Sequence, residues 1–447
     1  MKDATLKFRT ILSFGTISLP IGMIGLPIAI YLAPLYSGHF GISLGIIGTA
    51  LIATRLLDLI TDPLIGIISD QWRPSIGRRR VWLIIGTLTL MSGIFLLFRP
   101  VGEVNALYFI LAVSLAYFGL TTLRLPHIAW AGELSPDYHI RTRITSTLQF
   151  FSTIGLLASA VIPAIMAGQV EGDVSSLEVM RTIGLVILFL IPITTTLVFF
   201  TVPEPGAPPV KSGFDFRESA MLLVKNGPFV RLSVVILIST LGEAFRQSTT
   251  VFFARDVVGH ENIGQVYFFY FIAGLITIPF WAWLGKKMEK HRAFAVALFI
   301  VAATNAGMLA LSYGQTLEFM LLFTLKGTCF GGILLLPYSM IADTVDIDTA
   351  NSQDRQQGLF YSVEGMIQKL GFALGAGLPL IVLGWIGYDA AGEKNADSLF
   401  ALSVIYSLVP AVLVFVASVV IWNYSLTAAK QQELRDLIDQ KAQAQQA

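Results

Sequence analysis

The sequence predicts an all-α membrane protein in which twelve transmembrane helices form two pseudo-symmetric six-helix bundles. Three observations support this fold class. The chain of 447 residues is 55% hydrophobic and only 13% charged, whereas soluble proteins carry about 25% charged residues. Its apolar residues gather in runs long enough to cross a membrane. The longest polar break lies between the sixth and seventh runs, so it divides the chain into two halves of six runs each.

Twelve apolar runs account for most of the chain. Each is close to the roughly 20 residues that a helix needs to cross the hydrocarbon layer. The N-terminal segment is basic and has no small-residue cleavage site ahead of the first run, so we expect that run to be retained as a helix. In order, the predicted spans cover residues 11–34, 42–68, 81–99, 104–131, 141–168, 179–202, 230–254, 264–285, 293–313, 316–341, 360–386 and 398–423.

The polar segment PEPGAPPVKSGFDFRESA separates the sixth span from the seventh. Its prolines and glycines interrupt helices, and its charges favour water. We therefore expect a six-helix bundle over residues 1–202, a cytoplasmic linker over 203–229, a second bundle over 230–423 and a cytoplasmic tail over 424–447. Two related bundles around a central path are typical of transporters that bind substrate near the membrane midplane.

Lysines and arginines between the spans lie mostly on one side of the predicted membrane. Arg78, Arg79 and Arg80, for example, follow the second span, whereas the loops on the other side hold few basic residues. Because basic loops stay in the cytoplasm, we expect both termini to be cytoplasmic. We expect a multi-pass protein of the plasma membrane, the inner membrane of a bacterium, that works as a monomer within the lipid bilayer.

Two short motifs repeat between the halves. LPHIAWAGEL ends the fourth span and LPYSMIADTV ends the tenth, and in each an acid, Glu133 or Asp343, follows the Leu-Pro pair. SDQWRPSIGRRR, which follows the second span, is loosely matched by GKKMEKHR after the eighth. The alternative is a chance match, because a few apolar residue types dominate the sequence. The matching positions favour an internal duplication.

Composition and motifs exclude several classes of function. A net charge of +1 gives no bulk attraction to nucleic acid. The single cysteine, Cys329, rules out an internal disulfide, and no CxxC-type metal motif is present. No grouping of serine, histidine and aspartate and no nucleotide-binding loop indicates an enzyme. We therefore expect no catalytic residue and no cofactor other than a coupling ion.

The second span contains the stretch RLLDLITDPLIG, which places three charges among apolar residues. Asp58 and Asp62 are four residues apart and Arg55 precedes Asp58 by three, so all three share one helix face. Charges inside a membrane usually mark an ion or substrate path. Two nearby carboxylates suit a small cation or share a proton, and Thr121 or Thr122 of the fourth span would add a neutral oxygen. The alternative is a salt-bridge cluster that pins this helix to a neighbour.

Further polar side chains within the spans are candidates for the substrate path. Arg124 is a potential partner of a carboxylate or a phosphate, either an internal aspartate or an anionic substrate. Glu243 and Arg246 are three residues apart, so they pair with each other or face a substrate. Asp70 is expected to join the loop arginines in a latch of the outward-open state. The remaining candidates are Lys326, Glu364, Lys369 and, at the edge of the substrate path, Trp130.

Three segments of the chain resemble one family. DLITDPLIGIISDQWRPSIGRRRVW is similar to the helix-two signature of the glycoside–pentoside–hexuronide:cation symporters, the melibiose-permease group of the major facilitator superfamily. IADTVDIDTANSQDRQQGLFYSVEGMIQKLG resembles that family's signature from helix ten through helix eleven, and LPHIAWAGELSPDYHIRTRIT resembles its loop between helices four and five. With twelve spans, the resemblance covers nearly the whole chain and implies the major facilitator fold.

The resemblance implies a coupling-cation site. The family binds its cation with two helix-two aspartates and a helix-four threonine, which correspond to Asp58, Asp62 and Thr121. These three are the expected metal ligands if the ion is Na⁺. The lysine near that site corresponds to Lys369, and the arginine before the first aspartate corresponds to Arg55. The resemblance therefore implies a symporter coupled to Na⁺ or H⁺.

The family's sugar site does not carry over. Sugar-transporting members hold hydroxyls with an acid on helix one, where this chain has Gly22, and an acid on helix four, where it has Arg124. A carboxylate accepts hydrogen bonds from hydroxyls, whereas a guanidinium only donates. We therefore expect import of a small, sugar-like, anionic solute, such as a uronide or a sulfonated sugar, by alternating access. The alternatives are a lysophospholipid or other amphipathic lipid, as in the related vertebrate lysolipid carriers, and a non-transporting membrane sensor or scaffold.

Overall fold

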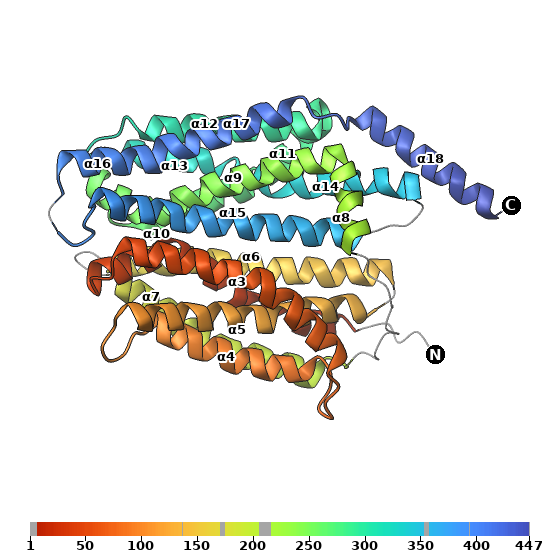
Figure 1. Ribbon diagram of the computed structural model, residues 1–447, viewed down its shortest axis with the longest axis horizontal. Helices are drawn as coiled ribbons and strands as arrows, with labels where there is room; N and C mark the ends of the chain where they lie inside the picture. Colours follow the sequence, from red (N-terminus) through yellow and green to blue (C-terminus); the bar gives the residue numbers. More distant parts are fainter. Residues whose placement is uncertain are drawn as a thin grey trace.

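The computed structural model describes residues 7–135, 137–169, 175–204, 216–352, 357–392 and 394–446, and over these residues it contains helices and no strands (Figure 1). Eleven helical runs are long and apolar enough to cross a membrane. The number is twelve if α10 (Ile263–Ile276) and α11 (Ile278–Met288), bent by 47° at their junction, form one span. The predicted all-α membrane fold is confirmed.

The spans of the first half follow the predicted order. The first span is interrupted and contains two α-helices and a short π-helix, whereas the next five are single helices. Their bounds are α1 (Phe8–Gly15), α2 (Ser18–Pro34), η1 (Leu35–His39), α3 (Leu44–Gln71), α4 (Arg80–Phe98), α5 (Ala106–Glu133), α6 (Tyr138–Gln169) and α7 (Ser176–Thr201).

The second half repeats six spans and adds two helices outside them. One short helix lies within the expected linker, and another follows the last span. The bounds are α8 (Phe216–Lys225), α9 (Gly227–Phe252), η2 (Phe253–Val258), α10, α11, α12 (Lys290–Met308), α13 (Thr316–Gly327), α14 (Phe330–Ser352), α15 (Gln357–Ile386), α16 (Ala396–Ser403), η3 (Val404–Leu408), α17 (Val409–Trp422) and α18 (Ala428–Gln446).

Polar caps set the start of several spans. The side chains of Ser43, Asn105, Asn262 and Asn395 each accept a hydrogen bond from a first-turn backbone N–H, in α3, α5, α10 and α16 respectively. A helix leaves its first four N–H groups without intrahelical partners, so such caps stabilise its start. All four lie at one end of the molecule, which we call the outer end. The opposite end, which we call the linker end, carries α8 and α18 (Figure 1).

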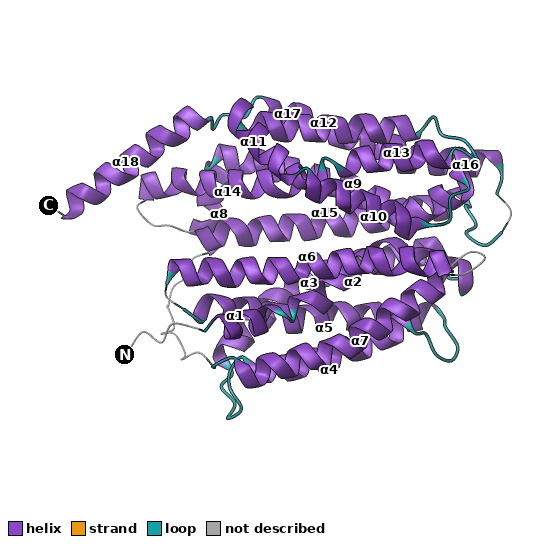
Figure 2. Ribbon diagram, turned by 180° about the vertical axis from the view of Figure 1, so that it is seen from behind, coloured by secondary structure: helices purple, strands orange, loops and turns teal. Residues whose placement is uncertain are grey.

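The two halves, α1–α7 and α9–α17, lie side by side as two groups of helices (Figures 1 and 2). Across the boundary α3 packs against α15, α6 against α10, and α2 against α9. The backbones approach most closely at the outer end, where a Cβ on Gly48 would lie 2.4 Å from the carbonyl oxygen of Gly377. One hydrophobic cluster spans both halves there, whereas a second cluster, toward the linker end, contains residues of the second half alone. The halves are therefore packed together at the outer end.

The sequence repeat reappears as a repeat of contacts at the linker end. Arg79 is buried, with Nη2 2.5 Å from Glu133 Oε1 and 2.7 Å from Asp70 Oδ1. In the second half, Lys290 Nζ lies 2.6 Å from Asp343 Oδ2. Although burial opposes it, the hydrogen bonds and charges of Glu133 and Asp70 raise the pKa of Arg79. The acid after each Leu-Pro motif thus holds a basic residue of the matching loop, and Asp70 lies with the loop arginines; its role as a latch stays a prediction.

Candidate functional site

One face of α3 carries the charged stripe that the sequence predicts. Arg55 Nη1 lies 3.3 Å from Asp58 Oδ2, and the Asp58 side chain is buried. Steps of three and four residues keep Arg55, Asp58 and Asp62 on the same face of the helix. The helices packed on α3 include α5 of the same half and α15 of the other half. The stripe therefore has neighbours from both halves of the molecule.

The helix α5 meets this stripe with one face of its own. Tyr117, Thr121 and Arg124 lie four and three residues apart, so they share that face. The guanidinium carbon of Arg55 lies 3.8 Å from the centre of the Tyr117 ring, a cation–π contact. Since α3 and α5 run in the same direction, Thr121, four residues after Tyr117, is expected in the same region as Asp58, three residues after Arg55. Thr121 is buried, as a ligand that completes a site beside the carboxylates would be.

The helix α15 of the second half contributes a lysine that pairs with the charged stripe of α3. Lys369 Nζ forms an ion pair with Asp62 Oδ2, and this pair joins the two halves. The other carboxylate oxygen, Asp62 Oδ1, is buried and accepts no hydrogen bond from any described residue. A buried polar atom without a partner is destabilising. This oxygen therefore retains its capacity to bind a ligand.

Arg124 has a different environment from the other charges. It is exposed although it lies in the inner part of a helix long enough to span the membrane. Among the described residues it has no hydrogen-bond or ion-pair partner, and the titratable groups that act on it electrostatically are Tyr338, Arg55 and Asp62. An exposed, unpaired guanidinium at membrane depth is expected on a water-filled path, not in lipid.

Helix packing explains why helix one has no acid at Gly22. A Cβ on Gly22 of α2 would lie 2.2 Å from the carbonyl oxygen of Ser152 on α6. Real Cβ atoms do not approach a backbone oxygen so closely, so no side chain fits there without moving one of the helices. An acid at this position is therefore incompatible with the close approach of α2 and α6.

Glu364 lies on the second-half side of the same region. It is buried, and Gln368 Nε2 donates a hydrogen bond to its Oε1. Tyr338 of α14 interacts electrostatically with both Glu364 and Arg124. The structure thus relates Glu364 and Arg124 through a tyrosine, without direct contact between the two charges.

Glu243, Arg246 and Lys326 come together in the second half as a separate cluster. Arg246 Nη2 lies 2.5 Å from Glu243 Oε1, and Lys326 Nζ lies 2.7 Å from Glu243 Oε2. The Arg246 guanidinium carbon lies 4.6 Å from the centre of the Phe323 ring. The expected Glu243–Arg246 pair is therefore present, and Lys326, predicted from its helix alone, is its third member.

Trp130 lies away from these clusters. It is completely buried, its Nε1 donates a hydrogen bond to the carbonyl oxygen of Pro203 at 3.3 Å, and its ring meets Phe14 edge-on. Sequence reasoning missed two members of the site, Tyr117 and Tyr338. Tyr117 had a usable signal, because it lies one turn before Thr121 on the same face, whereas nothing in the sequence around Tyr338 distinguishes it from a packing residue.

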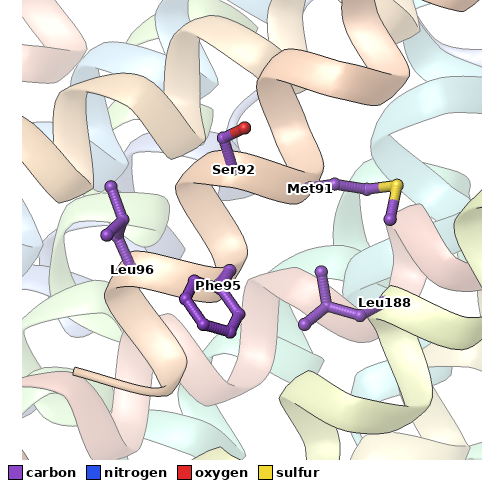
Figure 3. A pocket seen from close by; sticks show the side chains of 5 residues that line it. All are labelled: Met91, Ser92, Phe95, Leu96 and Leu188. Carbon is purple, nitrogen blue, oxygen red and sulfur yellow. The ribbon is translucent and has the colours of Figure 1, made fainter. Parts of the chain in front are cut away.

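A groove between α4 and α7 is shown in Figure 3. It is lined by Met91, Ser92, Phe95, Leu96 and Leu188, and the hydroxyl of Ser92 is its single polar side-chain group. It contains no residue of the charged clusters. An apolar groove on the outside of a membrane protein suits acyl chains, so we do not assign it to the candidate site.

Comparisons with known proteins identify the family of this chain. A family model described as "MFS/sugar transport protein" matches residues 13–428. The chain is 22% identical to "Inner membrane symporter YicJ" of Escherichia coli, over 99% of this chain and 96% of that protein. It is also 22% identical to "Glucuronide carrier protein homolog" of Escherichia coli, over 94% and 92% of the two chains.

A vertebrate protein and a solved structure are similar over most of their lengths as well. "Sodium-dependent lysophosphatidylcholine symporter 1-A" of Danio rerio is 20% identical over 83% of this chain and 77% of that protein. The structure of a bacterial homologue of the human lysosomal transporter Spinster has a TM-score of 0.64 at 14% identity, with 94% and 97% of the chains covered. At that identity the structural likeness supports the fold alone.

Proposed function

The chain belongs to the MFS/sugar transport protein family, a family of membrane transporters and not of enzymes, and from this premise we propose that it is a cation-coupled symporter. Its cargo would be a small, sugar-like anion that moves inward together with Na⁺ or H⁺. The division into residues 1–202 and 230–423, joined by a linker at 203–229, would supply the two bodies that rock about the substrate. We place the linker and both termini in the cytoplasm of a monomer in the plasma membrane.

The unpartnered oxygen of Asp62 is the observation that carries the coupling-ion site. Asp58, Asp62 and Thr121 supply only oxygen ligands, which suit Na⁺, and the two carboxylates equally suit a shared proton. Arg55 and Lys369 pair with the two aspartates in the described structure. A cation that binds would therefore compete with these two side chains for the carboxylates.

This competition gives a physical route from ion binding to movement. The pair between Asp62 and Lys369 joins the halves, so a cation that takes the place of the lysine at Asp62 changes the energy of contact between them. Ligands shift a conformational equilibrium only through such a difference in binding between states. Asp70, with its loop arginines, would stabilise the linker end of the first half in both states or act as its latch.

Arg124 supports an anionic cargo. Arg124 is exposed and unpaired among the described residues, and its guanidinium presents several donors and no acceptor. The similarity to a protein named as a glucuronide carrier homolog agrees with an anionic sugar. We propose that Arg124 binds the carboxylate or sulfonate of the solute, and that Glu364 lies near the opposite side of the path.

The proposal is tested by uptake into proteoliposomes under an imposed Na⁺ or H⁺ gradient. We expect Asp58→Asn and Asp62→Asn each to abolish accumulation of radiolabelled D-glucuronate, while Asp397→Asn, at an exposed position in α16, accumulates it normally. Gradient-driven accumulation by both neutralised variants would contradict the ion site.

A lipid cargo is the second candidate, favoured by the similarity to a lysophosphatidylcholine symporter. A phosphate would satisfy Arg124 as well as a carboxylate does. The same vesicles, loaded with labelled lysophosphatidylcholine as the cargo, separate the two. Uptake of the lipid and not of D-glucuronate would show that the cargo is a lipid and not a sugar acid. Uptake of neither would favour a sensor or scaffold.

A further inference from the structure

The cluster of Glu243, Arg246 and Lys326 carries more charge than internal pairing requires. Two cations share one carboxylate, so with all three groups ionised the cluster has a net charge of +1. The side chains of Arg246 and Lys326 are 0% and 1% exposed, whereas that of Glu243 is 24% exposed. A ligand that approaches from water therefore meets the carboxylate first.

The helix that carries Glu243 also packs against the first half. Gln247, also partly exposed, donates a hydrogen bond from Nε2 to Glu243 Oε1 at 3.3 Å. Their helix, α9, packs against α2 of the first half. Tyr31 of α2 interacts electrostatically with Tyr267 of α10, which lies beside Arg246. The carboxylate is therefore presented close to the boundary between the two halves.

The chemistry of the cluster selects a hydroxyl as its ligand. Two buried cations behind Glu243 repel a further cation, and the exposed carboxylate repels an anion. Lys326 Nζ has no hydrogen-bond partner of good geometry among the described residues, although it is in ion contact with Glu243. A hydroxyl donates one hydrogen bond and accepts others, so it satisfies the carboxylate and the neighbouring ammonium together.

We propose that Glu243 recognises hydroxyl groups of the solute, so that the substrate is a hydroxylated anion held at two ends. Its anionic group binds Arg124 of the first half, and its hydroxyls bind Glu243 of the second half. This inference rests on the proposed transport function and narrows its cargo. Arg246 and Lys326 are positioning residues that hold the carboxylate ionised and in place. A solute bound to both halves favours the state in which they close around it.

Binding to the purified full-length protein tests this with three probes: D-glucuronate, hexanoate, and methyl β-D-glucoside. The first two share six carbons and one carboxylate, so they differ chiefly in hydroxyl groups. We expect D-glucuronate to bind at least about tenfold more tightly than hexanoate, because hydrogen bonds to a charged group contribute this much. Glu243→Gln removes that difference and leaves hexanoate binding unchanged. Arg124→Ala weakens both anions, and Glu103→Gln, an exposed loop carboxylate, changes neither.

Each outcome bears on one statement. Unchanged D-glucuronate binding by Glu243→Gln overturns the inference. Hexanoate bound as tightly as D-glucuronate, with both dependent on Arg124, also overturns it but leaves the anion transporter intact. Binding of the neutral glucoside that depends on Glu243 and not on Arg124 supports hydroxyl recognition and overturns the anionic cargo. Binding of none of the three probes overturns both substrate statements.

Loss of the carboxylate that neutralises two buried cations can unfold the protein, so two further variants keep the test decisive. Glu243→Gln combined with Lys326→Met removes one charge of each sign and keeps the net charge of the cluster, and it should still lose the preference for D-glucuronate. Lys326→Met alone should weaken the binding of D-glucuronate without changing the binding of hexanoate. Lys326→Arg, which keeps the charge, should bind D-glucuronate nearly as tightly as the native protein. A purely structural lysine would change both probes alike.

Discussion

At the scale of single residues, the ion pair between Asp62 and Lys369 gives the proposed ion site an internal competitor for the ion. Asp62 uses one oxygen for Lys369 and leaves the other without a partner. In the proposed ion site, the lysine would therefore act as a tethered cation that occupies part of the space for the ion. Arg55 has the same relation to Asp58, with its guanidinium held in place by the Tyr117 ring.

Lys369→Met should therefore strengthen ion binding and uncouple transport. Without its competitor, Asp62 is free for the ion, and we expect the ion concentration that gives half-maximal thermal stabilisation to fall by about tenfold. Lys369→Arg, which keeps the charge, should stay near the native value. Thermal melting during titration with Na⁺, and with protons in Na⁺-free buffer, measures this. Unchanged ion affinity in Lys369→Met would show that the lysine does not compete.

A second residue-scale prediction concerns Gly22. Gly22→Asp introduces an acid where the sugar-transporting members of the resembled family have one. Its Cβ, however, would collide with the Ser152 carbonyl oxygen. We expect destabilisation of about 1–3 kcal/mol, as for other overpacked sites, and no gain of neutral-sugar binding. Gly25→Asp is the control, since a Cβ at Gly25 meets no atom within 4 Å. A stable Gly22→Asp protein that binds methyl β-D-glucoside would contradict this account.

At the scale of elements, most helices could be predicted because each span is a continuous apolar run. The interior breaks could not. The predicted span 264–285 is divided at Thr277, where Pro279 follows and has no N–H to donate, and the Thr277 hydroxyl donates to the Ala273 carbonyl oxygen. Hydropathy does not register such a bend, because a proline is tolerated in many membrane helices.

The candidate site divides in the same way. The charged face of α3 follows from helical spacing, so Asp58 and Asp62 could be chosen from the residues alone, whereas only the family resemblance selects Thr121 over Thr122. The ion pair between Glu243 and Lys326 could not be predicted from sequence, because α9 and α13 are distant in the chain and only packing brings them together. The burial of Trp130 likewise depends on a tertiary contact with Pro203.

The repeated linker-end contacts give an element-scale prediction. Arg79 is 1% exposed, whereas Lys290 of the second half is 36% exposed. We expect Arg79→Met to destabilise the protein by about 2 kcal/mol, since it removes a buried guanidinium that is hydrogen-bonded to Glu133 and Asp70, although Arg78 still contacts Glu133. Lys290→Met should cost about 1 kcal/mol or less, because solvent screens an exposed pair. Thermal unfolding in detergent compares the two, and equal effects would contradict the burial argument.

At the scale of the whole molecule, the two halves meet at the outer end and share a hydrophobic cluster there. With the linker end in the cytoplasm, this arrangement closes the path to the outside. Transport then requires the same contacts to open. Glycines make that contact possible, since the backbones of α3 and α15 approach where Gly48 faces Gly377. A side chain at this point should therefore act on the equilibrium between states and not only on stability.

Gly48→Trp should shift the protein toward the state open at the outer end. Ile52, one turn further along α3, would touch a Cβ on Gly377 and so lies within the same seam. A cysteine there, Ile52→Cys, in a background with the single native cysteine removed by Cys329→Ser, reports opening. We expect a membrane-impermeant thiol reagent added outside intact cells to label Ile52→Cys several-fold faster when Gly48→Trp is present.

The matched control is Gly45→Trp, on the same helix, where a Cβ meets no atom within 4 Å. Its backbone lies beside Gly384 of α15, but its side chain would point away from the packed atoms, so the same bulk does not wedge the seam and labelling should remain slow. Equal labelling with and without Gly48→Trp would contradict the outer seam as the moving contact. Labelling that requires a membrane-permeant reagent would instead place this seam on the cytoplasmic side and reverse the orientation. These two outcomes give different labelling patterns. The experiment therefore tests separately whether the seam opens and on which side of the membrane it lies.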